Sequence, residues 1–177
     1  MQAMILINDG FEEIEAFTIV DILRRVKTKI TIVGLVSTVV ESARKVKVIV
    51  DKRFSEIDPK SYDILILPGG PGYKTMMNSQ AVLNLIRDFN RKGKLIAAIC
   101  AAPCILAKAG ILDDRLATVY PGLEKEIPRP RDAKIIVDRN IITSRSPGTA
   151  MEFALKIAEI LAGKKEVKRL KESFSIE

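Results

Sequence analysis

The sequence predicts an α/β fold in which helices cover both faces of a mostly parallel β-sheet. Apolar segments of strand length alternate with segments of helical periodicity along the 177 residues. Several of the apolar segments are hydrophobic throughout, as strands buried on both faces are. The composition, 47% hydrophobic and 29% charged, is typical of a globular protein. We therefore expect one domain over residues 1–177, built as a three-layer α/β/α sandwich.

The first elements follow from short apolar runs and the turns between them. Segment 3–8, AMILIN, predicts a buried strand that ends before Asp-Gly. Segment 11–26 has apolar residues at helical spacing and acids at its start, where they favour the helix macrodipole. A strand is expected at 29–35. A hairpin is expected over 38–50, because its second arm alternates Lys and Val.

The middle of the chain continues the alternation. DILIL at 63–67 predicts a buried strand that ends in PGGPG, and apolar residues on one side predict a helix over 79–91. KLIAAI at 94–99 predicts another buried strand. It runs directly into a segment that predicts a helix over 101–112.

The last third begins with an irregular segment at 119–133, which contains three prolines. Loops of this length in compact domains are often functional. Two short strands are expected over 134–143, an apolar helix over 147–162 and a charged helix over 164–172.

The sequence carries a net charge of +7. Its basic residues near the C-terminus alternate with Glu166 and Glu172, which indicates a solvated helix face rather than a nucleic-acid patch. The members of this basic cluster are Lys164, Lys165, Lys168, Arg169 and Lys171. We expect no nucleic-acid partner, except as a substrate for repair.

Histidine is absent, and cysteine occurs only at Cys100 and Cys104. The absence of histidine excludes a Cys-His or Ser-His triad within one chain, and two cysteines are too few for an all-thiolate zinc site. We expect neither a metal nor a cofactor. The first residues lack the basic start of a secretory signal, and no apolar run is long enough to span a membrane. We therefore expect a cytoplasmic location, reduced thiols and no membrane partner.

Cys100 lies where the strand at 94–99 meets the following helix, between pairs of alanines. Small neighbours suit the sharp turn of a nucleophile elbow, in which the apex side chain is exposed and the backbone strained. N–H groups of a helix that starts at Ala101 would lower the pKa of Cys100. The alternative is a buried structural cysteine, which is the interpretation that we favour for Cys104.

Gly69 and Gly70 end the neighbouring strand, where their N–H groups can approach a substrate. One of them, with the N–H of Ala101, can form an oxyanion hole. The alternative is a simple tight turn. Glu15 lies on a largely apolar helix, where a carboxyl group held beside Cys100 would have a raised pKa. Protonated, it would donate a hydrogen bond to the sulfur. Residue pattern alone does not place Glu15 beside Cys100.

Four blocks in this order resemble the ThiJ/PfpI superfamily, closest to its parkinsonism-protein deglycase (DJ-one) branch. The blocks are GFEEIEAFTIVDILRR, LPGGPG, AAICAAPCILAKAGIL and ITSRSPGTAMEFAL. The resemblance covers nearly the whole chain. It implies a flavodoxin-like sandwich with a nucleophile elbow, which class I glutamine amidotransferases share, and a homodimer.

The resemblance also implies roles for individual residues. Cys100 would be the nucleophile and Glu15 the acid hydrogen-bonded to it. The anion pocket would be framed by Gly69, Gly70 and Ala101. The resemblance also implies that Pro147 lies at the pocket mouth and that Tyr120 and Glu12 line the pocket. It places Glu12, Arg25 and Arg44 near the dimer interface or its polar network.

Two departures from the family pattern bear on activity. Tyr120 stands where members commonly carry a histidine near the cysteine, and a tyrosine side chain ionises only near pH 10, so it is a poor base. Ala101 stands where the peptidase-like branch has histidine, which makes peptidase activity unexpected. The missing histidine also argues against a glutamine amidotransferase.

The leading hypothesis is a glutathione-independent glyoxalase or deglycase that acts on methylglyoxal-like α-oxoaldehydes or their early adducts. Cys100 would attack the aldehyde, and Glu15 would carry protons. The alternative is a redox sensor or stress chaperone with little turnover, in which Cys100 oxidises to a sulfinate.

Overall fold

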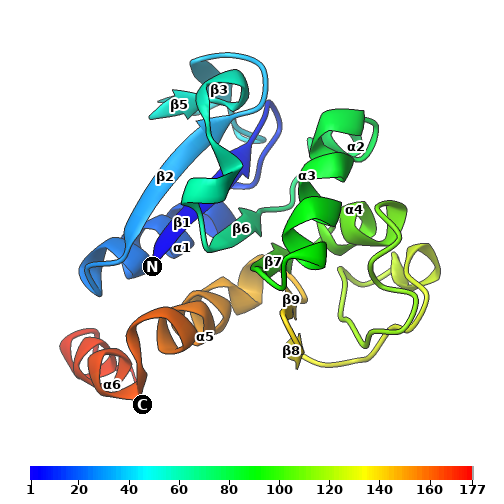
Figure 1. Cartoon of the computed structure of the whole chain (residues 1–177). Helices are drawn as coiled ribbons and strands as arrows, with labels where there is room; N and C mark the ends of the chain where they lie inside the picture. Colours follow the sequence, from blue (N-terminus) through cyan, green and yellow to red (C-terminus); the bar gives the residue numbers. More distant parts are fainter. Residues whose placement is uncertain (177) are drawn as a thin grey trace.

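The central sheet of the computed structural model, which describes residues 1–176, has seven strands in the order β5-β2-β1-β6-β7-β9-β8 (Figure 1). All neighbouring strands are parallel except β8 and β9. Their bounds are β1 Gln2–Ile7, β2 Lys29–Gly34, β5 Lys52–Arg53, β6 Ile64–Leu67, β7 Leu95–Ile99, β8 Ile135–Asp138 and β9 Ile141–Ser144. The order of the long parallel strands is that of flavodoxin-like folds, so the predicted fold class is confirmed.

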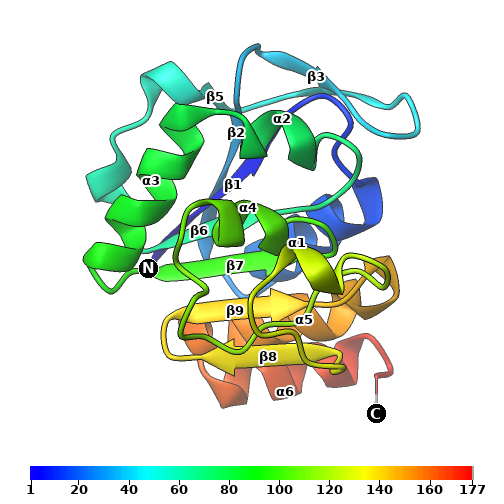
Figure 2. The same cartoon turned by 90° about the vertical axis from the view of Figure 1, so that its right-hand side faces the viewer.

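Helices cover the sheet on both faces. Figure 2 shows α3 and α4 in front of the sheet, with α1, α5 and α6 behind it. The helix bounds are α1 Glu13–Arg25, α2 Tyr73–Met77, α3 Gln80–Arg91, α4 Pro103–Lys108, α5 Ala150–Ala162 and α6 Lys164–Ser173. None of the helices in the described residues combines the length and apolar character that crossing a membrane requires.

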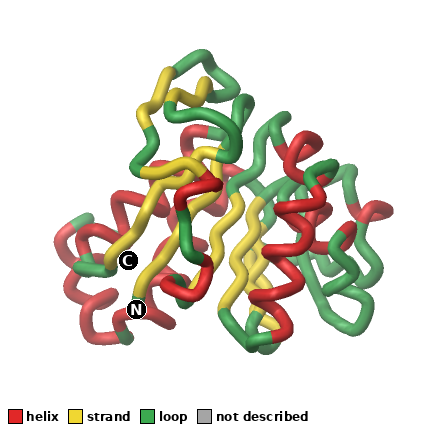
Figure 3. Tube along the Cα trace, turned by 45° about the horizontal axis from the view of Figure 1, so that its top comes forward, coloured by secondary structure: helices red, strands yellow, loops and turns green. Residues whose placement is uncertain are grey.

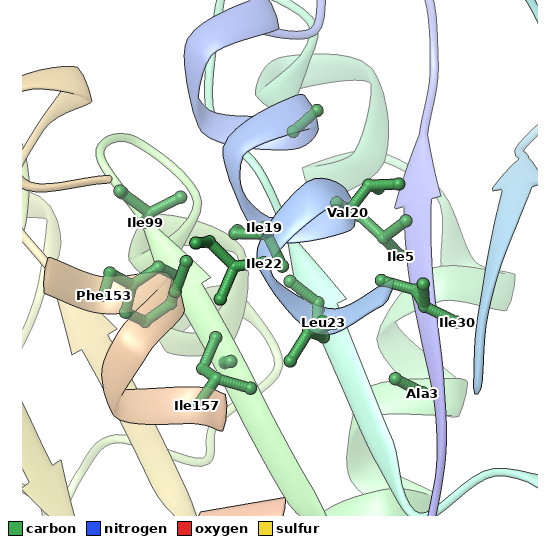
Figure 4. Close-up of a cluster of buried hydrophobic side chains, with 14 of the residues drawn as sticks. Ala3, Ile5, Ile19, Val20, Ile22, Leu23, Ile30, Ile99, Phe153 and Ile157 are labelled. Atoms are coloured by element: carbon green, nitrogen blue, oxygen red, sulfur yellow. The ribbon is translucent and has the colours of Figure 1, made fainter. Parts of the chain in front are cut away.

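Each face of the sheet has its own apolar core. Alternate residues of the buried strands point to opposite faces, as Ile5 does toward α1 and Leu6 toward the α3 side. On the first face, Ile19 and Ile22 of α1 lie beside Phe153 of α5 (Figure 4). The fully apolar strands predicted from the sequence are therefore buried on both sides.

A short antiparallel hairpin, β3 (Val39–Glu41) with β4 (Lys47–Ile49), projects from the sheet (Figure 3). It lies within the predicted span 38–50. The backbone N–H of Gly10 donates to the carbonyl of Glu41, and that of Ala43 donates to the carbonyl of Phe11. These bonds hold the hairpin against the loop between β1 and α1.

The structure corrects two helix starts. The helix predicted from Ala101 begins at Pro103, because Ala101 and Ala102 form a tighter turn in which their carbonyls accept the N–H groups three residues on. The helix predicted from Pro147 begins at Ala150, after a 3₁₀ turn over Pro147–Thr149. Helix α2 after the Gly-Pro-Gly turn was not predicted, since five residues give little periodicity.

Candidate functional site

Cys100 occupies a sharp turn between β7 and α4 with a φ of 64°. A non-glycine residue adopts this left-handed conformation at a cost, so the surroundings must hold it. Two backbone hydrogen bonds do so: the N–H of Cys100 donates to the carbonyl of Ser144 at 2.8 Å, and the N–H of Tyr120 donates to the carbonyl of Cys100 at 2.8 Å. The strained turn predicted from the alanine pattern is present.

The structure does not show the exposure predicted for the side chain at the apex of this turn. Cys100 retains only 8% of its accessible surface, and Ala101 only 7%. The end of β6 packs directly against the apex, since a Cβ on Gly69 would lie 2.8 Å from the Cβ of Cys100, and Cys100 is nearly buried. A reactant must therefore be small, or reach the sulfur through a narrow opening.

Glu15 lies on the first turn of α1 and is fully buried. The backbone N–H of Gly69 donates to its Oε2 at 2.6 Å. The thiol of Cys100 lies within hydrogen-bonding reach of the same carboxyl group. Oε1 accepts no hydrogen bond from the N–H and O–H groups of the described residues. The structure thus brings Glu15 and Cys100 together from distant parts of the chain.

Gly69 and Gly70, at the end of β6, form the third part of the site beside Cys100 and Glu15. A Cβ on Gly69 would lie 2.8 Å from both the Cβ of Cys100 and Oε2 of Glu15. Gly70 has a φ of 90°, and a Cβ there would lie 2.4 Å from the carbonyl oxygen of Gly10. Both positions therefore require glycine, for packing at the first and for conformation and packing at the second.

The N–H groups divide between the two functional side chains. Those of Gly70 and Ala101 face the sulfur of Cys100, whereas that of Gly69 is bound to Glu15. Of the two glycines expected to supply an N–H, Gly70 is therefore the one that can pair with Ala101. Gly70 and Ala101 are the pair that can meet an oxyanion beside the sulfur.

Burial raises the pKa of Glu15 to about 7, opposed by the hydrogen bonds from Gly69 and Cys100. Burial raises the pKa of Cys100 as well, and so does the ionised carboxylate of Glu15, while the N–H groups of Ala101 and Gly70 lower it. The predicted lowering of the Cys100 pKa is thus wrong. Because two adjacent buried charges are unfavourable, the pair carries a single negative charge over a wide pH range and shares one proton.

The other predicted pocket residues lie around this centre. Tyr120 is 45% exposed and is joined to Cys100 by its backbone only. Pro147 is half-buried and follows Ser144 closely. Glu12 is half-buried at the start of α1, near enough that its charge raises the pKa of Glu15.

The two arginines predicted near an interface lie apart from the sulfur. The guanidinium of Arg25 is 4.6 Å from the ring centre of Phe174 and pairs with Asp21. The backbone N–H of Arg44 donates to Oε1 of Glu13 at 2.7 Å.

Sequence reasoning missed the residues that support the site. Oε1 of Glu13 accepts hydrogen bonds from the Ser42 hydroxyl and from Arg44, which fixes the start of α1 against the hairpin. The hydroxyl groups of Ser144 and Thr149 lie 2.7 Å apart in the buried strand end that holds Cys100. The sequence ITSRSPGT places several hydroxyl side chains at the end of an apolar strand, and this pattern could have predicted the roles of Ser144 and Thr149.

Cys104 is the second residue of α4 and is 3% exposed. It belongs to the core of the α3 face, whereas Cys100 belongs to the core of the other face. Burial and the charge of Glu126 raise the pKa of Cys104 to about 11, in agreement with the structural role predicted for it. Within residues 1–176, no three cysteine, aspartate or glutamate side chains group as potential metal ligands.

Comparisons with known proteins agree over the whole fold. Protein dj-1beta of Drosophila melanogaster is 38% identical over 174 residues, covering 95% of this chain and 93% of the relative. Its crystal structure matches with a TM-score of 0.95 over 99% of this chain and 98% of that one. The glutathione-independent glyoxalase DJR-1.2 of Caenorhabditis elegans is 33% identical over 172 residues, covering 95% of this chain and 92% of the relative. Residues 1–160 match the DJ-1/PfpI family, and the chain therefore belongs to it.

Proposed function

We propose that this chain is a cysteine-dependent glyoxalase or deglycase that acts without glutathione on methylglyoxal-like α-oxoaldehydes or their early adducts. The observation that carries the proposal is the pairing of Cys100, at the strained elbow, with the fully buried carboxyl group of Glu15. The name of the C. elegans relative supports the same reaction class. The small exposed fraction of Cys100 suits a small aldehyde.

In the first step, the sulfur of Cys100 attacks the aldehyde carbon and forms a hemithioacetal. The proton shared by Cys100 and Glu15 moves to the former aldehyde oxygen, so Glu15 is left as a carboxylate. The N–H groups of Gly70 and Ala101 face the sulfur and are placed to stabilise the oxyanion as it forms.

In the second step, the Glu15 carboxylate takes the hydrogen of the former aldehyde carbon as a proton and returns it to the neighbouring ketone carbon. The hydroxyl proton on the former aldehyde oxygen moves to the ketone oxygen. The aldehyde carbon is oxidised and the ketone carbon is reduced, so no external oxidant is needed. The product is a thioester of lactate on Cys100. Water hydrolyses it, releasing lactate and the thiol.

The test is lactate formation from methylglyoxal by wild type, Cys100→Ala and Cys104→Ala. We expect Cys100→Ala to fall to the rate of buffer alone and Cys104→Ala to retain activity, because Cys104 lies in the opposite core. Equal rates for wild type and Cys100→Ala would refute the proposal.

A second candidate function is redox sensing or stress protection through oxidation of Cys100 to a sulfinate. The N–H groups of Gly70 and Ala101 favour it, since they would also donate hydrogen bonds to sulfinate oxygens. A solved structure of Toxoplasma gondii DJ-1, with a TM-score of 0.94 and 31% identity, is of the oxidised protein. Intact mass after mild peroxide tests it: a gain of two oxygen atoms on Cys100, with low lactate formation, would favour sensing.

We also propose that the chain forms a homodimer in the cytoplasm. Apolar side chains stand exposed on and beside the hairpin, which in turn is bonded to the loop before α1. A second copy is the partner whose own apolar patch matches this one.

A further inference from the structure

A second feature lies beside the elbow: a cavity of about 290 Å³, whose lining includes Thr118, Val119, Glu124, Arg131, Asp132 and Arg145. Val119 precedes Tyr120, and Arg145 follows Ser144. Tyr120 and Ser144 are the two residues whose backbones bind the backbone of Cys100. Two residues of the cavity lining are therefore next in sequence to the residues that hold the elbow.

The strand register gives the distance scale. Ile99 of β7 pairs with Ser144 of β9. Cys100 and Arg145 are therefore the next residues along these two adjacent strands. Adjacent strands lie about 5 Å apart, so the backbone of Arg145 leaves the sheet about that far from the backbone of Cys100. On this scale, a ligand that reacts at the sulfur and reaches Arg145 needs a chain of a few carbon atoms between its two ends.

The cavity is polar and has two guanidinium groups. Nη1 of Arg145 lies 2.7 Å from Oδ1 of Asp132, whose side chain is 84% exposed. A pair this exposed contributes little to stability, so another carboxylate can replace Asp132. Within the described residues Arg131 has no carboxylate partner; its Nη1 donates to the carbonyl of Pro130 at 2.8 Å.

The balance of charge indicates what kind of anion fits. Two guanidinium groups face two carboxylates, Asp132 and Glu124, and the Glu124 carboxylate already accepts the N–H of Gly122. A ligand carboxylate that displaces Asp132 keeps the charges in balance and matches the planar fork of Arg145. A doubly charged phosphate would add an uncompensated charge.

We infer that this cavity is a carboxylate subsite, and that the preferred substrates are α-oxoaldehydes that carry a carboxylate a few carbon atoms from the aldehyde. The inference rests on the proposed function, because the reacting end is still the aldehyde attacked by Cys100. Arg145 binds the carboxylate, and Arg131 adds positive charge beside it.

The reaction on such a substrate is the same internal redox exchange. The sulfur adds to the aldehyde carbon and forms a hemithioacetal. One proton then moves from that carbon to the ketone carbon, and the hydroxyl proton moves to the ketone oxygen. Water cleaves the resulting thioester. The aldehyde and ketone become a carboxylate and an alcohol, with release of one proton. The product is a hydroxydicarboxylic acid, and the distal carboxylate is unchanged.

The test compares an α-oxoaldehyde whose carboxylate lies two methylene groups beyond the ketone with its neutral methyl ester. We expect wild type to show a kcat/KM about tenfold higher for the acid, the size of one charge-assisted hydrogen bond. In Arg145→Gln this ratio should fall to about one. In Asp132→Asn it should rise, because the competing carboxylate is gone.

Arg129→Gln is the matched control, because Arg129 lies exposed in the same loop outside the cavity lining. It should keep the wild-type ratio. A wild-type ratio near one, or an unchanged ratio in Arg145→Gln, would overturn the inference.

A binding measurement separates this inference from the proposed function. Levulinate has the ketone and the carboxylate but lacks the aldehyde, so it cannot react. NMR titration of the Cys100→Ala protein should show tighter binding of levulinate than of methyl levulinate, and Arg145→Gln should abolish the difference. If that difference is found without Cys100-dependent turnover of methylglyoxal, the subsite stands and the proposed reaction fails. If levulinate and its ester bind alike, the subsite is refuted.

Discussion

At the scale of single residues, the chemistry depends on one proton held between Cys100 and Glu15. Burial raises the pKa of both groups, and an ionised Glu15 raises that of the thiol further. The first proton to leave therefore belongs to the pair, with an apparent pKa of about 7. The singly charged pair has both a nucleophile and a base, whereas the neutral pair has neither.

The pH dependence of turnover follows from this pair. We expect kcat/KM for methylglyoxal to rise through an inflection near pH 7 in wild type. In Glu15→Gln the buried thiol must lose its own proton, so the inflection should move to higher pH. Activity at pH 7 should fall by about a hundredfold, the usual contribution of an acid–base group. A stopped assay for lactate from pH 5 to 10 measures both; the same profile in the two proteins would contradict a shared proton.

The same carboxyl group sets a pH dependence of stability. The pKa of Glu15 is raised in the folded protein, from 4.5 to about 7, so the folded state holds a proton that the unfolded state has released. Its contribution is fully present below pH 4.5 and is lost as pH rises through 7. The loss is on the order of 3 kcal/mol, since one pKa unit is about 1.4 kcal/mol. We expect Glu15→Gln to unfold at higher urea than wild type at pH 8, and at similar urea at pH 4.5.

Asp88→Asn is the control for that measurement. Asp88 forms its ion pairs at the surface, with Arg91 and Lys92, and these pairs lower its pKa. Its stability difference from wild type should have the opposite sign. A Glu15→Gln protein that is less stable than wild type at pH 8 would mean that the ionised carboxylate does not lower the free energy of unfolding.

At the scale of elements, the ends of three parallel strands build the site. β1 leads to the helix that carries Glu15, β6 ends at Gly69 and Gly70, and β7 ends at Cys100. β1 and β6 are neighbours, and the chain leaves β1 toward β2 on one side and returns to β6 on the other. Ligand sites in open α/β sheets form at such a switch point.

Gly70→Ala tests how closely these strand ends fit. A Cβ at φ 90° is strained, and at 2.4 Å from the carbonyl oxygen of Gly10 it must also displace backbone. We expect a loss of about 2–3 kcal/mol of unfolding free energy. Gly110→Ala is the control, because Gly110 has a φ of 76° with nothing within 4 Å and should lose only about 1 kcal/mol. Urea denaturation of both proteins measures the difference. Equal losses of unfolding free energy would mean that the backbone at Gly10 shifts at little cost to accommodate the Cβ.

The elements also show what the sequence could and could not predict. Alanines around Cys100 predicted the turn, because only small side chains fit beside it. They could not predict its burial, which depends on strand ends far along the chain. The partner of Cys100 was predicted only through family resemblance, since a carboxylate on one apolar helix does not specify which strand end it meets. Which glycine N–H binds Glu15 depends on distances of tenths of an ångström, and residue type does not determine these.

At the scale of the whole molecule, apolar surface is concentrated at one end. The hairpin and the neighbouring loops expose Val36, Val39, Val46 and Ile49, and Ile14 stands exposed at the start of α1. Val36 and Ile49 are each 78% exposed, which is high for large aliphatic side chains. The hairpin is bonded to the loop that precedes Glu15, so a partner covering it would also hold the helix that positions the acid.

We therefore expect about twice the chain mass of 19.6 kDa by light scattering after size exclusion, and a monomer for Ile49→Lys. A lysine at the centre of an apolar interface leaves a charge buried without a partner, which favours dissociation. Val137→Lys is the control: Val137 is 48% exposed on β8, the strand at the sheet edge opposite β5. If Val137→Lys dissociates and Ile49→Lys does not, the interface lies along β8 instead.

Because the hairpin contacts the loop before α1, Ile49→Lys should also lower lactate formation, whereas Val137→Lys should not. A monomeric Ile49→Lys with wild-type turnover would show that the site is complete within one chain.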